Sequence, residues 1–193
     1  MNNKIHKYNG ALECFAIWKG VFCDEDIEQI KKIEELQTFQ AGTAGTQLRK
    51  EIRDSDVSFI ARDQHSEWLY NKISSMIGTV NRDHFLYNVD GFQAIQYTKY
   101  KLDQHYTWHW DVHFGYQTDQ RKISMVTVLN DPDEYEGGEF EICTNGNIED
   151  PRSFKPEKGD AVFFASWMPH RVKSVTKGER KSLVVWATGP RES

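Results

Sequence analysis

Residues 105–114 read His-Tyr-Thr-Trp-His-Trp-Asp-Val-His-Phe, and this decapeptide decides how the second half of the chain is interpreted. In a β-strand, successive side chains point to opposite faces. A strand would therefore carry one polar face, made of His105, Thr107, His109, Asp111 and His113, and one apolar face, made of Tyr106, Trp108, Trp110, Val112 and Phe114. A helix would instead spread the aromatic rings around its axis. The pattern predicts a strand.

The polar face of this strand has two interpretations. The first is that this face is exposed to water on a half-exposed antiparallel strand. The second is that His109 and Asp111 bind a metal ion. A metal site needs a third ligand, and His170 is the best candidate because it follows an apolar run, 161–166, and a Met-Pro turn. Two histidines and one carboxylate form the facial triad of non-haem Fe(II) oxygenases, and the same set can hold catalytic Zn²⁺. These ligands alone leave the metal open.

A charge argument favours iron with a chelating cosubstrate. Fe²⁺ with one aspartate keeps one net positive charge, and 2-oxoglutarate brings two negative charges. Its distal carboxylate then needs a cation inside the cavity, ideally an arginine. Arg180 follows His170 across the glycine-containing segment "SVTKGERKS", 174–182. We expect a hairpin there to return Arg180 to the strand next to that of His170.

The composition of the whole chain limits the classes of protein that fit. A net charge of −5 and a pI of 5.8 argue against a partner made of duplex nucleic acid. Residues 1–8 lack the apolar segment of a signal peptide, and no run of about 18 apolar residues could span a membrane. Three scattered cysteines, Cys14, Cys23 and Cys143, suit a reducing compartment. We expect a cytoplasmic protein without a membrane partner.

The first half of the chain alternates strand and helix signals. We predict strands over 12–22 and 57–61, and a loop over 40–46 that is mobile. Asp24 is expected to cap a helix with the buried stripe Ile27, Ile30, Ile33 and Leu36. Ser66 is expected to cap a second helix with Leu69, Ile73, Ile77 and Val80 on its buried face.

The second half contains short β-type runs separated by turn signals. The predicted strands cover 92–100, 105–114, 123–129, 139–143, 161–166, 172–176 and 182–188. Closely spaced strands without helices between them predict an antiparallel barrel or sandwich. We expect one domain over 1–193, mainly β with some helix, in which 1–90 supports a β core at 91–193.

Four ordered segments resemble a known family. They are "YKLDQHYTWHWD" (100–111), "YEGGEFEI" (135–142), "PEKGDAVFF" (156–164) and "HRVKSVTKGERKSLVVW" (170–186). They resemble the catalytic domain of the prolyl 4-hydroxylase-like Fe(II)/2-oxoglutarate dioxygenases, which include the PKHD-type hydroxylases. "VFCDEDIEQI" (21–30) and "SEWLYNKI" (66–73) are similar to the more variable N-terminal support of that family.

The resemblance implies a double-stranded β-helix and a role for each matching residue. His109, Asp111 and His170 would be the iron ligands, and Arg180 would bind the C5 carboxylate of 2-oxoglutarate. Tyr100 would hydrogen-bond the same carboxylate. Trp186 would line the cosubstrate cavity, and Asp103 stands where the family usually has a glycine. The implied cofactors are Fe(II), 2-oxoglutarate and O₂, with ascorbate as a candidate reductant.

The activity implied by the resemblance is hydroxylation of an unactivated C–H bond with release of succinate and CO₂. A prolyl residue in a peptide or protein is the leading substrate. The same chemistry on a free amino acid, another small molecule or a modified base is the alternative, and a non-catalytic metal-binding member of the fold is a third. A zinc hydrolase is disfavoured because it would leave Arg180 without a role.

Residues around the motif have weaker assignments. We expect His105 and His113 to be surface residues or neighbours of the ligands, and Trp108 and Trp110 to belong to the core. The loop containing Gly42 and Gly45 is expected either to close over the substrate or to be an ordinary connector. Arg121 opens the strand after the metal motif and is a candidate for the substrate entrance.

Overall fold

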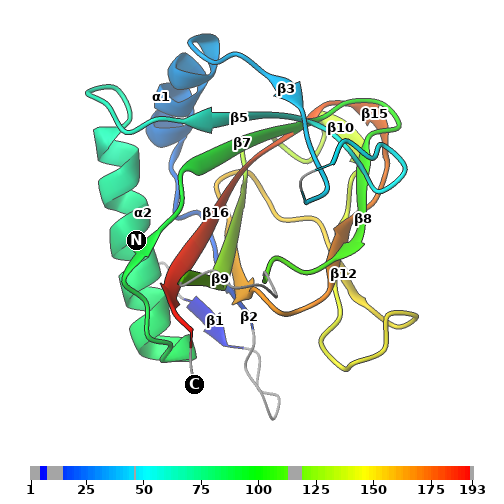
Figure 1. Ribbon diagram of the computed structural model, residues 1–193. Helices are drawn as coiled ribbons and strands as arrows, with labels where there is room; N and C mark the ends of the chain where they lie inside the picture. Colours follow the sequence, from blue (N-terminus) through cyan, green and yellow to red (C-terminus); the bar gives the residue numbers. More distant parts are fainter. Residues whose placement is uncertain (1–4, 8–14, 46, 113–118, 192–193) are drawn as a thin grey trace.

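The computed structural model describes residues 5–7, 15–45, 47–112 and 119–191, and its two α-helices lie along one face of a large antiparallel sheet (Figure 1). The strand order of this major sheet is β1 (Ile5–Lys7), β2 (Phe15–Trp18), β13 (Ala161–Ala165), β9 (Asp119–Val128), β16 (Arg180–Pro190), β7 (Ile95–Tyr100), β5 (Asp56–Ile60) and β3 (Gln40–Ala41). A further strand, β6 (Gly91–Phe92), pairs with β16.

A smaller sheet faces the major one. Its strand order is β12 (Arg152–Phe154), β11 (Phe140–Ile142), β14 (His170–Val172), β8 (His105–His109) and β4 (Arg53–Asp54). The strands β10 (Tyr135–Gly137) and β15 (Val175–Gly178) form a separate pair. The mainly β architecture is that of a double-stranded β-helix with helical support, so the predicted fold class is confirmed.

The two faces of the major sheet bury different sets of residues. Alternate residues of β16 illustrate this: Leu183 and Val185 belong to the core beneath the helices, whereas Val184 belongs to the core between the sheets. The period of two along the strand produces this separation. The strand therefore connects the helical support to the interior of the β-helix.

The helix α1 (Asp24–Glu35) buries Ile27, Ile30 and Ile33 as predicted. Two details of that prediction are wrong. Cys23 rather than Asp24 occupies the N-cap position, and the N–H of Cys23 donates to the Asp26 carboxylate over 2.9 Å. Leu36 is 67% exposed because the helix ends before it, so it does not continue the buried stripe.

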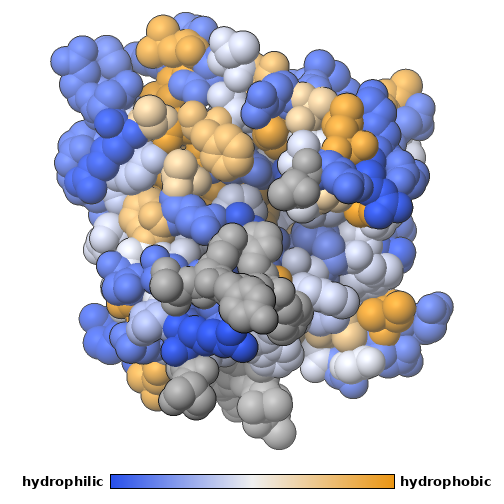
Figure 2. Space-filling model, in the orientation of Figure 1, coloured by the Kyte–Doolittle hydropathy of each residue, from blue (hydrophilic) through white to orange (hydrophobic). Residues whose placement is uncertain are grey.

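The helix α2 (Glu67–Val80) follows its N-cap residue Ser66 as predicted, and all four residues of its predicted stripe are buried. A turn of π-helix, Asn81–Phe85, extends it. Neither helix is long and apolar enough to cross a membrane, a statement limited to the described residues. The face of the molecule in Figure 2 is largely hydrophilic, with separate small apolar patches.

Several strand boundaries differ from the sequence prediction. The predicted strand 172–176 is divided between β14 and β15, which lie in different sheets, and 92–100 is divided between β6 and β7. The strands β3, β4, β10 and β12 were not predicted; each has only two or three residues, too few to show periodicity. β8 ends at His109, so Asp111 lies just beyond the strand. His113 and Phe114 lie outside the described residues.

Candidate active site

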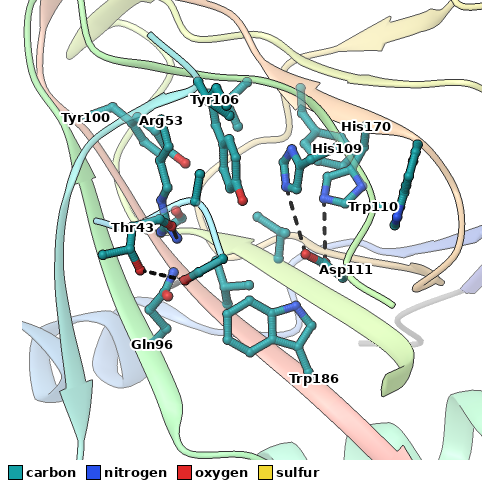
Figure 3. A pocket seen from close by; sticks show the side chains of 18 of the residues that line it. Thr43, Arg53, Gln96, Tyr100, Tyr106, His109, Trp110, Asp111, His170 and Trp186 are labelled. Atoms are coloured by element: carbon teal, nitrogen blue, oxygen red, sulfur yellow. Dashed lines mark hydrogen bonds and ion pairs between the residues drawn. The ribbon is translucent and has the colours of Figure 1, made fainter. Parts of the chain in front are cut away.

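Three side chains that could hold a metal ion meet between the two sheets. His109 ends β8, Asp111 follows it, and His170 begins the neighbouring strand β14, where it pairs directly with His109. One ligand atom from each of the three lies within 4.8 Å of the others. The Nε2 atoms of His109 and His170 are 3.8 and 3.5 Å from the Asp111 carboxylate, and both imidazoles point toward it (Figure 3). The structure thus brings together the three predicted ligands.

Backbone carbonyl groups fix the orientation of both imidazoles. Nδ1 of His109 lies 2.8 Å from the carbonyl oxygen of Thr107, and Nδ1 of His170 lies 2.9 Å from that of Met168. A carbonyl oxygen only accepts hydrogen bonds, so each Nδ1 carries the proton. In the neutral form of each ring, Nε2 then keeps its lone pair and directs it at the space shared with Asp111, which is the arrangement that metal-binding histidines require.

Asp111 is held by two buried serines. Ser124 on β9 donates to its Oδ2 over 2.7 Å, and the hydroxyl groups of Ser124 and Ser166 are 3.0 Å apart. The carbonyl oxygen of Ser166 accepts from the N–H of Asp111. Burial alone would raise the pKa of this carboxyl, but His170, His109 and Ser124 outweigh it and lower the pKa. The group is a carboxylate at neutral pH.

Burial also controls the protonation of His109. Burial lowers its pKa to about 3, and the neighbouring His170 adds to this effect. The imidazole is therefore neutral at physiological pH, with Nε2 available as a ligand. Two imidazoles and one carboxylate form a nitrogen–oxygen set that suits Fe(II) or Zn²⁺.

A β-bulge changes the predicted alternation along β8. His109 pairs with His170 and Tyr106 pairs with Val172, so three steps on β8 match two steps on β14. The ring of Tyr106 consequently stacks on the His109 imidazole, with ring centroids 3.4 Å apart, and lines the same cavity. The prediction of strictly separate polar and aromatic faces is wrong at this point.

The two tryptophans of the motif are not in the core. Trp110 is 55% exposed and lines the cavity beyond the end of β8. Trp108 is half-buried in a groove on the outer side of the smaller sheet, where the Arg171 guanidinium lies 4.7 Å from its ring centroid. His105 lines the same groove and lies away from the ligand cluster, as a surface residue would.

A cavity of about 420 Å³ extends from the ligand cluster along the inner face of the major sheet. Its floor follows the alternate residues of β16: Trp186, Val184, Ser182 and Arg180. Trp186 pairs with Ser124, which holds Asp111, and Arg180 at the opposite end pairs with Tyr100 of β7. The register therefore places Arg180 at the far end of the cavity from the ligands.

Arg180 is a buried cation with unused donors. Only 1% of the residue is exposed, and Nη1 donates to Ser182 over 3.2 Å. Nε and Nη2 have no hydrogen-bond partner among the described residues. The absence of a side chain at Gly138 makes room for Arg180, since a Cβ there would lie 3.0 Å from Cδ of the arginine. A buried guanidinium with free donors requires an anionic partner.

The path of the chain to Arg180 differs from the predicted hairpin. His170 lies on β14 of the smaller sheet, whereas Arg180 lies on β16 of the major sheet. The chain crosses from one sheet to the other through β15, so the two residues face each other across the cavity instead of lying on adjacent strands. Asp103 adopts a φ of 66°, in the left-handed region, which explains why a glycine would also fit there.

The segment 40–45 forms part of the cavity wall, and Thr43, Ala44 and Gly45 line it. Arg53 on β4 holds this segment, because its Nη1 donates to the carbonyl oxygen of Thr43 over 3.1 Å. Figure 3 shows Arg53 beside Tyr106, with Thr43 and Gln96 nearby. Arg53 and Gln96 were not predicted, because neither lies in a motif; the pairing of β4 with β8 brings Arg53 here, and the pairing of β7 with β5 brings Gln96.

Comparison with known proteins agrees with this geometry. Residues 95–188 match the family model of the 2OG-Fe(II) oxygenase superfamily. A PKHD-type hydroxylase of Psychrobacter sp. (strain PRwf-1) is 35% identical over 95 residues, which is 47% of this chain and 36% of that protein. A PKHD-type hydroxylase of Teredinibacter turnerae is 41% identical over 64 residues, 33% of this chain and 27% of that protein. The matches thus span about a third of these relatives.

Solved structures share the fold over most of the chain. A Pseudomonas putida prolyl-4-hydroxylase is similar with a TM-score of 0.72 at 19% identity, covering 92% of both chains. A Trichoplax adhaerens prolyl hydroxylase, solved with a hypoxia inducible factor peptide fragment, gives 0.74 at 19% identity, covering 90% of this chain and 82% of that one. A viral collagen prolyl hydroxylase from Paramecium Bursaria Chlorella virus-1, in a 2OG complex, gives 0.70 at 20%, covering 93% and 99%.

The donor set and the buried Arg180, with two donor nitrogens unused, fit Fe(II) and 2-oxoglutarate, the two molecules that the family is named for. Zn²⁺ hydrolysis would give this cation no role. Residues 95–188, which contain both features, therefore belong to the 2OG-Fe(II) oxygenase superfamily, in a chain with the fold of the prolyl 4-hydroxylases.

Proposed function

We propose that this protein is an Fe(II)- and 2-oxoglutarate-dependent dioxygenase that hydroxylates an unactivated C–H bond, with a prolyl residue of a peptide as the leading substrate. One observation carries the proposal: a buried guanidinium with free donors lies at the far end of the cavity that begins at the two-histidine, one-carboxylate cluster. A chelating dicarboxylate such as 2-oxoglutarate would bind the metal with one end and the Arg180 guanidinium with the other.

Each residue of the cavity has a role in this proposal. His109, Asp111 and His170 would hold the metal through Nε2, a carboxylate oxygen and Nε2. Arg180 would bind the C5 carboxylate of 2-oxoglutarate, with the Tyr100 hydroxyl as a second donor. Trp186 would close the floor beside the ligands. Burial raises the pKa of Tyr100, which therefore keeps its proton for donation.

The apolar side chains of the cavity would exclude water from the reaction. Val126, Phe140, Val172 and Val184 are among the residues that line it. Fe(II) and 2-oxoglutarate, when bound, supply the oxidising power for hydroxylation, with succinate and CO₂ as coproducts. A dry cavity protects such a reactive site from side reactions. The segment 40–45 is proposed as a lid, because its residues Thr43, Ala44 and Gly45 line the cavity and Arg53 binds Thr43.

A peptide substrate is supported by the cavity entrance. Phe59 and Trp110 line the cavity and are 50% and 55% exposed, which offers aromatic surfaces to an apolar ring such as that of proline. The similar Trichoplax protein was solved with a peptide. We also propose that the chain acts as one catalytic domain in a reducing compartment such as the cytoplasm, which suits the free thiols Cys23 and Cys143.

The test is 2-oxoglutarate turnover. The purified chain with Fe(II), 2-oxoglutarate and ascorbate should form succinate, and proline-containing peptides should increase the rate. His170→Ala should abolish succinate formation, while His105→Ala, a change on the outer groove, should preserve it. Succinate formation by the His170→Ala variant at the original rate would contradict the proposal.

A further inference from the structure

With a divalent metal bound, the cavity would hold more positive charge than Asp111 and 2-oxoglutarate can neutralise. Three arginines line it, Arg53, Arg121 and Arg180, while Asp111 is the single carboxylate among its described lining residues. None of the three guanidinium groups forms an ion pair with a described residue. Elsewhere in the protein, partly buried cations are paired: Lys99 with Glu34 and Arg171 with Glu141.

The charge count separates these three arginines. Fe²⁺, Asp111 and the C1 carboxylate of 2-oxoglutarate sum to zero, and Arg180 with the C5 carboxylate also sums to zero. Arg53 and Arg121 then leave two positive charges. Desolvated cations are normally neutralised in proteins, because removing them from water is costly. The remaining molecule that enters this cavity is the primary substrate.

Arg53 is held in place but keeps one donor nitrogen free. The residue is 8% exposed, its Nε donates to Ser55 over 3.0 Å, and its Nη1 donates to Thr43. Nη2 has no hydrogen-bond partner among the described residues. Its guanidinium carbon lies 4.8 Å from the ring centroid of Tyr106, which stacks on His109. Arg53 is therefore preorganised close to the ligand cluster.

Arg121 is fixed in a similar way beside the floor of the cavity. Its guanidinium carbon lies 3.8 Å from the ring centroid of Trp186, and Nε and Nη2 both donate to Oε1 of Gln93, over 3.0 and 2.8 Å. Nη1 has no partner within the part of the chain that the structure describes. Burial lowers the pKa of Arg121, and Asp111 is close enough to oppose this effect. Its position is thus set before any ligand binds.

We propose that the primary substrate carries a carboxylate close to the hydroxylated carbon, and that Arg53 and Arg121 bind this carboxylate. This inference rests on the proposed function, since it treats the metal and 2-oxoglutarate as already bound. This carboxylate could belong to an acidic residue next to the hydroxylated residue of a peptide, or it could be the α-carboxylate of a free amino acid. Guanidinium–carboxylate hydrogen bonds are charge-assisted and therefore discriminate strongly against a neutral isostere.

The test compares matched acidic and neutral probes by calorimetry on the chain loaded with redox-inert Mn(II) and 2-oxoglutarate. One pair is acetyl-Ala-Glu-Pro-Ala-amide and its Gln counterpart, and the other is L-proline and L-prolinamide. In at least one pair, the acidic member should bind about 10-fold tighter or more, and added salt should reduce the difference. The pair that shows the preference identifies the source of the carboxylate.

Variants connect this preference to the two arginines. Arg121→Gln should remove most of the preference, and Arg121→Lys, which keeps the charge, should retain part of it. Arg62→Gln is the matched control, because Arg62 is exposed, pairs with Glu67 and is not among the residues that line the cavity. Equal binding of acidic and neutral members in both pairs, or binding by neither, would overturn the inference. Failure of 2-oxoglutarate itself to bind would instead contradict the proposed function.

Discussion

Two neighbouring rungs of the same strand pair, β7 and β16, place charged side chains on opposite faces of the major sheet. Arg180 pairs with Tyr100 and faces the cavity, whereas Lys181 pairs with Lys99 and faces the helices. The outward rung is paired within the protein, because Glu34 of α1 accepts from both lysines and the Glu179 carboxylate lies 3.7 Å from Nζ of Lys181. The inward rung has free donors.

The outward cluster is complete without a ligand. Glu34 also accepts from the Tyr97 hydroxyl, which is 1% exposed. Burial alone would raise the pKa of Glu34, but the bonds from Lys99, Tyr97 and Lys181 lower it. The buried network around Glu34 is satisfied and joins the helix to the sheet. Arg180, one residue before Lys181, keeps free donors, and such unsatisfied buried groups are what a ligand-binding site provides.

The largest expected effect is on the metal. His170→Ala removes one of the three ligand atoms and should weaken Fe(II) or Co(II) binding by about 100-fold or more, because each ligand contributes strongly to affinity. Metal titration followed by absorbance or calorimetry measures this. His105→Ala is the control, and its affinity should equal that of the original chain. Unchanged metal affinity in His170→Ala would show that His170 is not a metal ligand.

Arg180→Ala tests the inward rung directly. Loss of a buried guanidinium should weaken 2-oxoglutarate binding by about 100-fold, the value of two charge-assisted hydrogen bonds, while metal uptake is preserved. Lys181→Ala, its neighbour on the opposite face, should leave 2-oxoglutarate affinity unchanged. Binding measured on the Mn(II)-loaded protein distinguishes the two variants. Similar losses in both would show that the comparison between the faces is wrong.

Glu34→Gln tests the outward rung. It should lower the free energy of unfolding by about 2 kcal/mol, because Lys99 and Lys181 would remain partly buried without their counter-charge. Urea denaturation measures this change. The affinity for 2-oxoglutarate should stay the same, and a large loss of that affinity would mean that the two faces are coupled.

The pH dependence of the metal-free protein gives the smallest expected effect. The pKa of His109 is lowered to about 3 in the folded state, from about 6.5 in the unfolded chain. The unfolded chain therefore binds more protons between these values, and stability falls as the pH decreases through this window. We expect a loss of about 1–2 kcal/mol between pH 7 and pH 5, and a smaller loss in His109→Gln. Equal losses in both proteins would contradict the assignment to His109.

The sequence was sufficient for the parts of the molecule that depend on local pattern. The stripe of α2 and the β-rich second half follow from periodicity, and the three candidate ligands were found from the spacing of His109 and Asp111 with a histidine after an apolar strand. These features need only a period of two or 3.6 residues and an apolar core.

Other features depend on pairing between distant segments, which periodicity does not report. The bulge that turns Tyr106 into the cavity exists because β8 pairs with β14 out of step. The exposure of Trp110 follows from the early end of β8, and the position of Arg53 follows from the pairing of β4 with β8. The chain also crosses from one sheet to the other after His170, and the turn residues between His170 and Arg180 could not distinguish this crossing from a hairpin.

The central claim is that one cavity binds Fe(II) and 2-oxoglutarate together, and anaerobic titration tests it most directly. Fe(II) added to the metal-free protein with 2-oxoglutarate should produce a visible charge-transfer absorption band, because the cosubstrate chelates the metal. Arg180→Ala should require much more 2-oxoglutarate to give the same band, and His170→Ala should give none. The absence of a band in the original chain, or a full band in His170→Ala, would contradict the account.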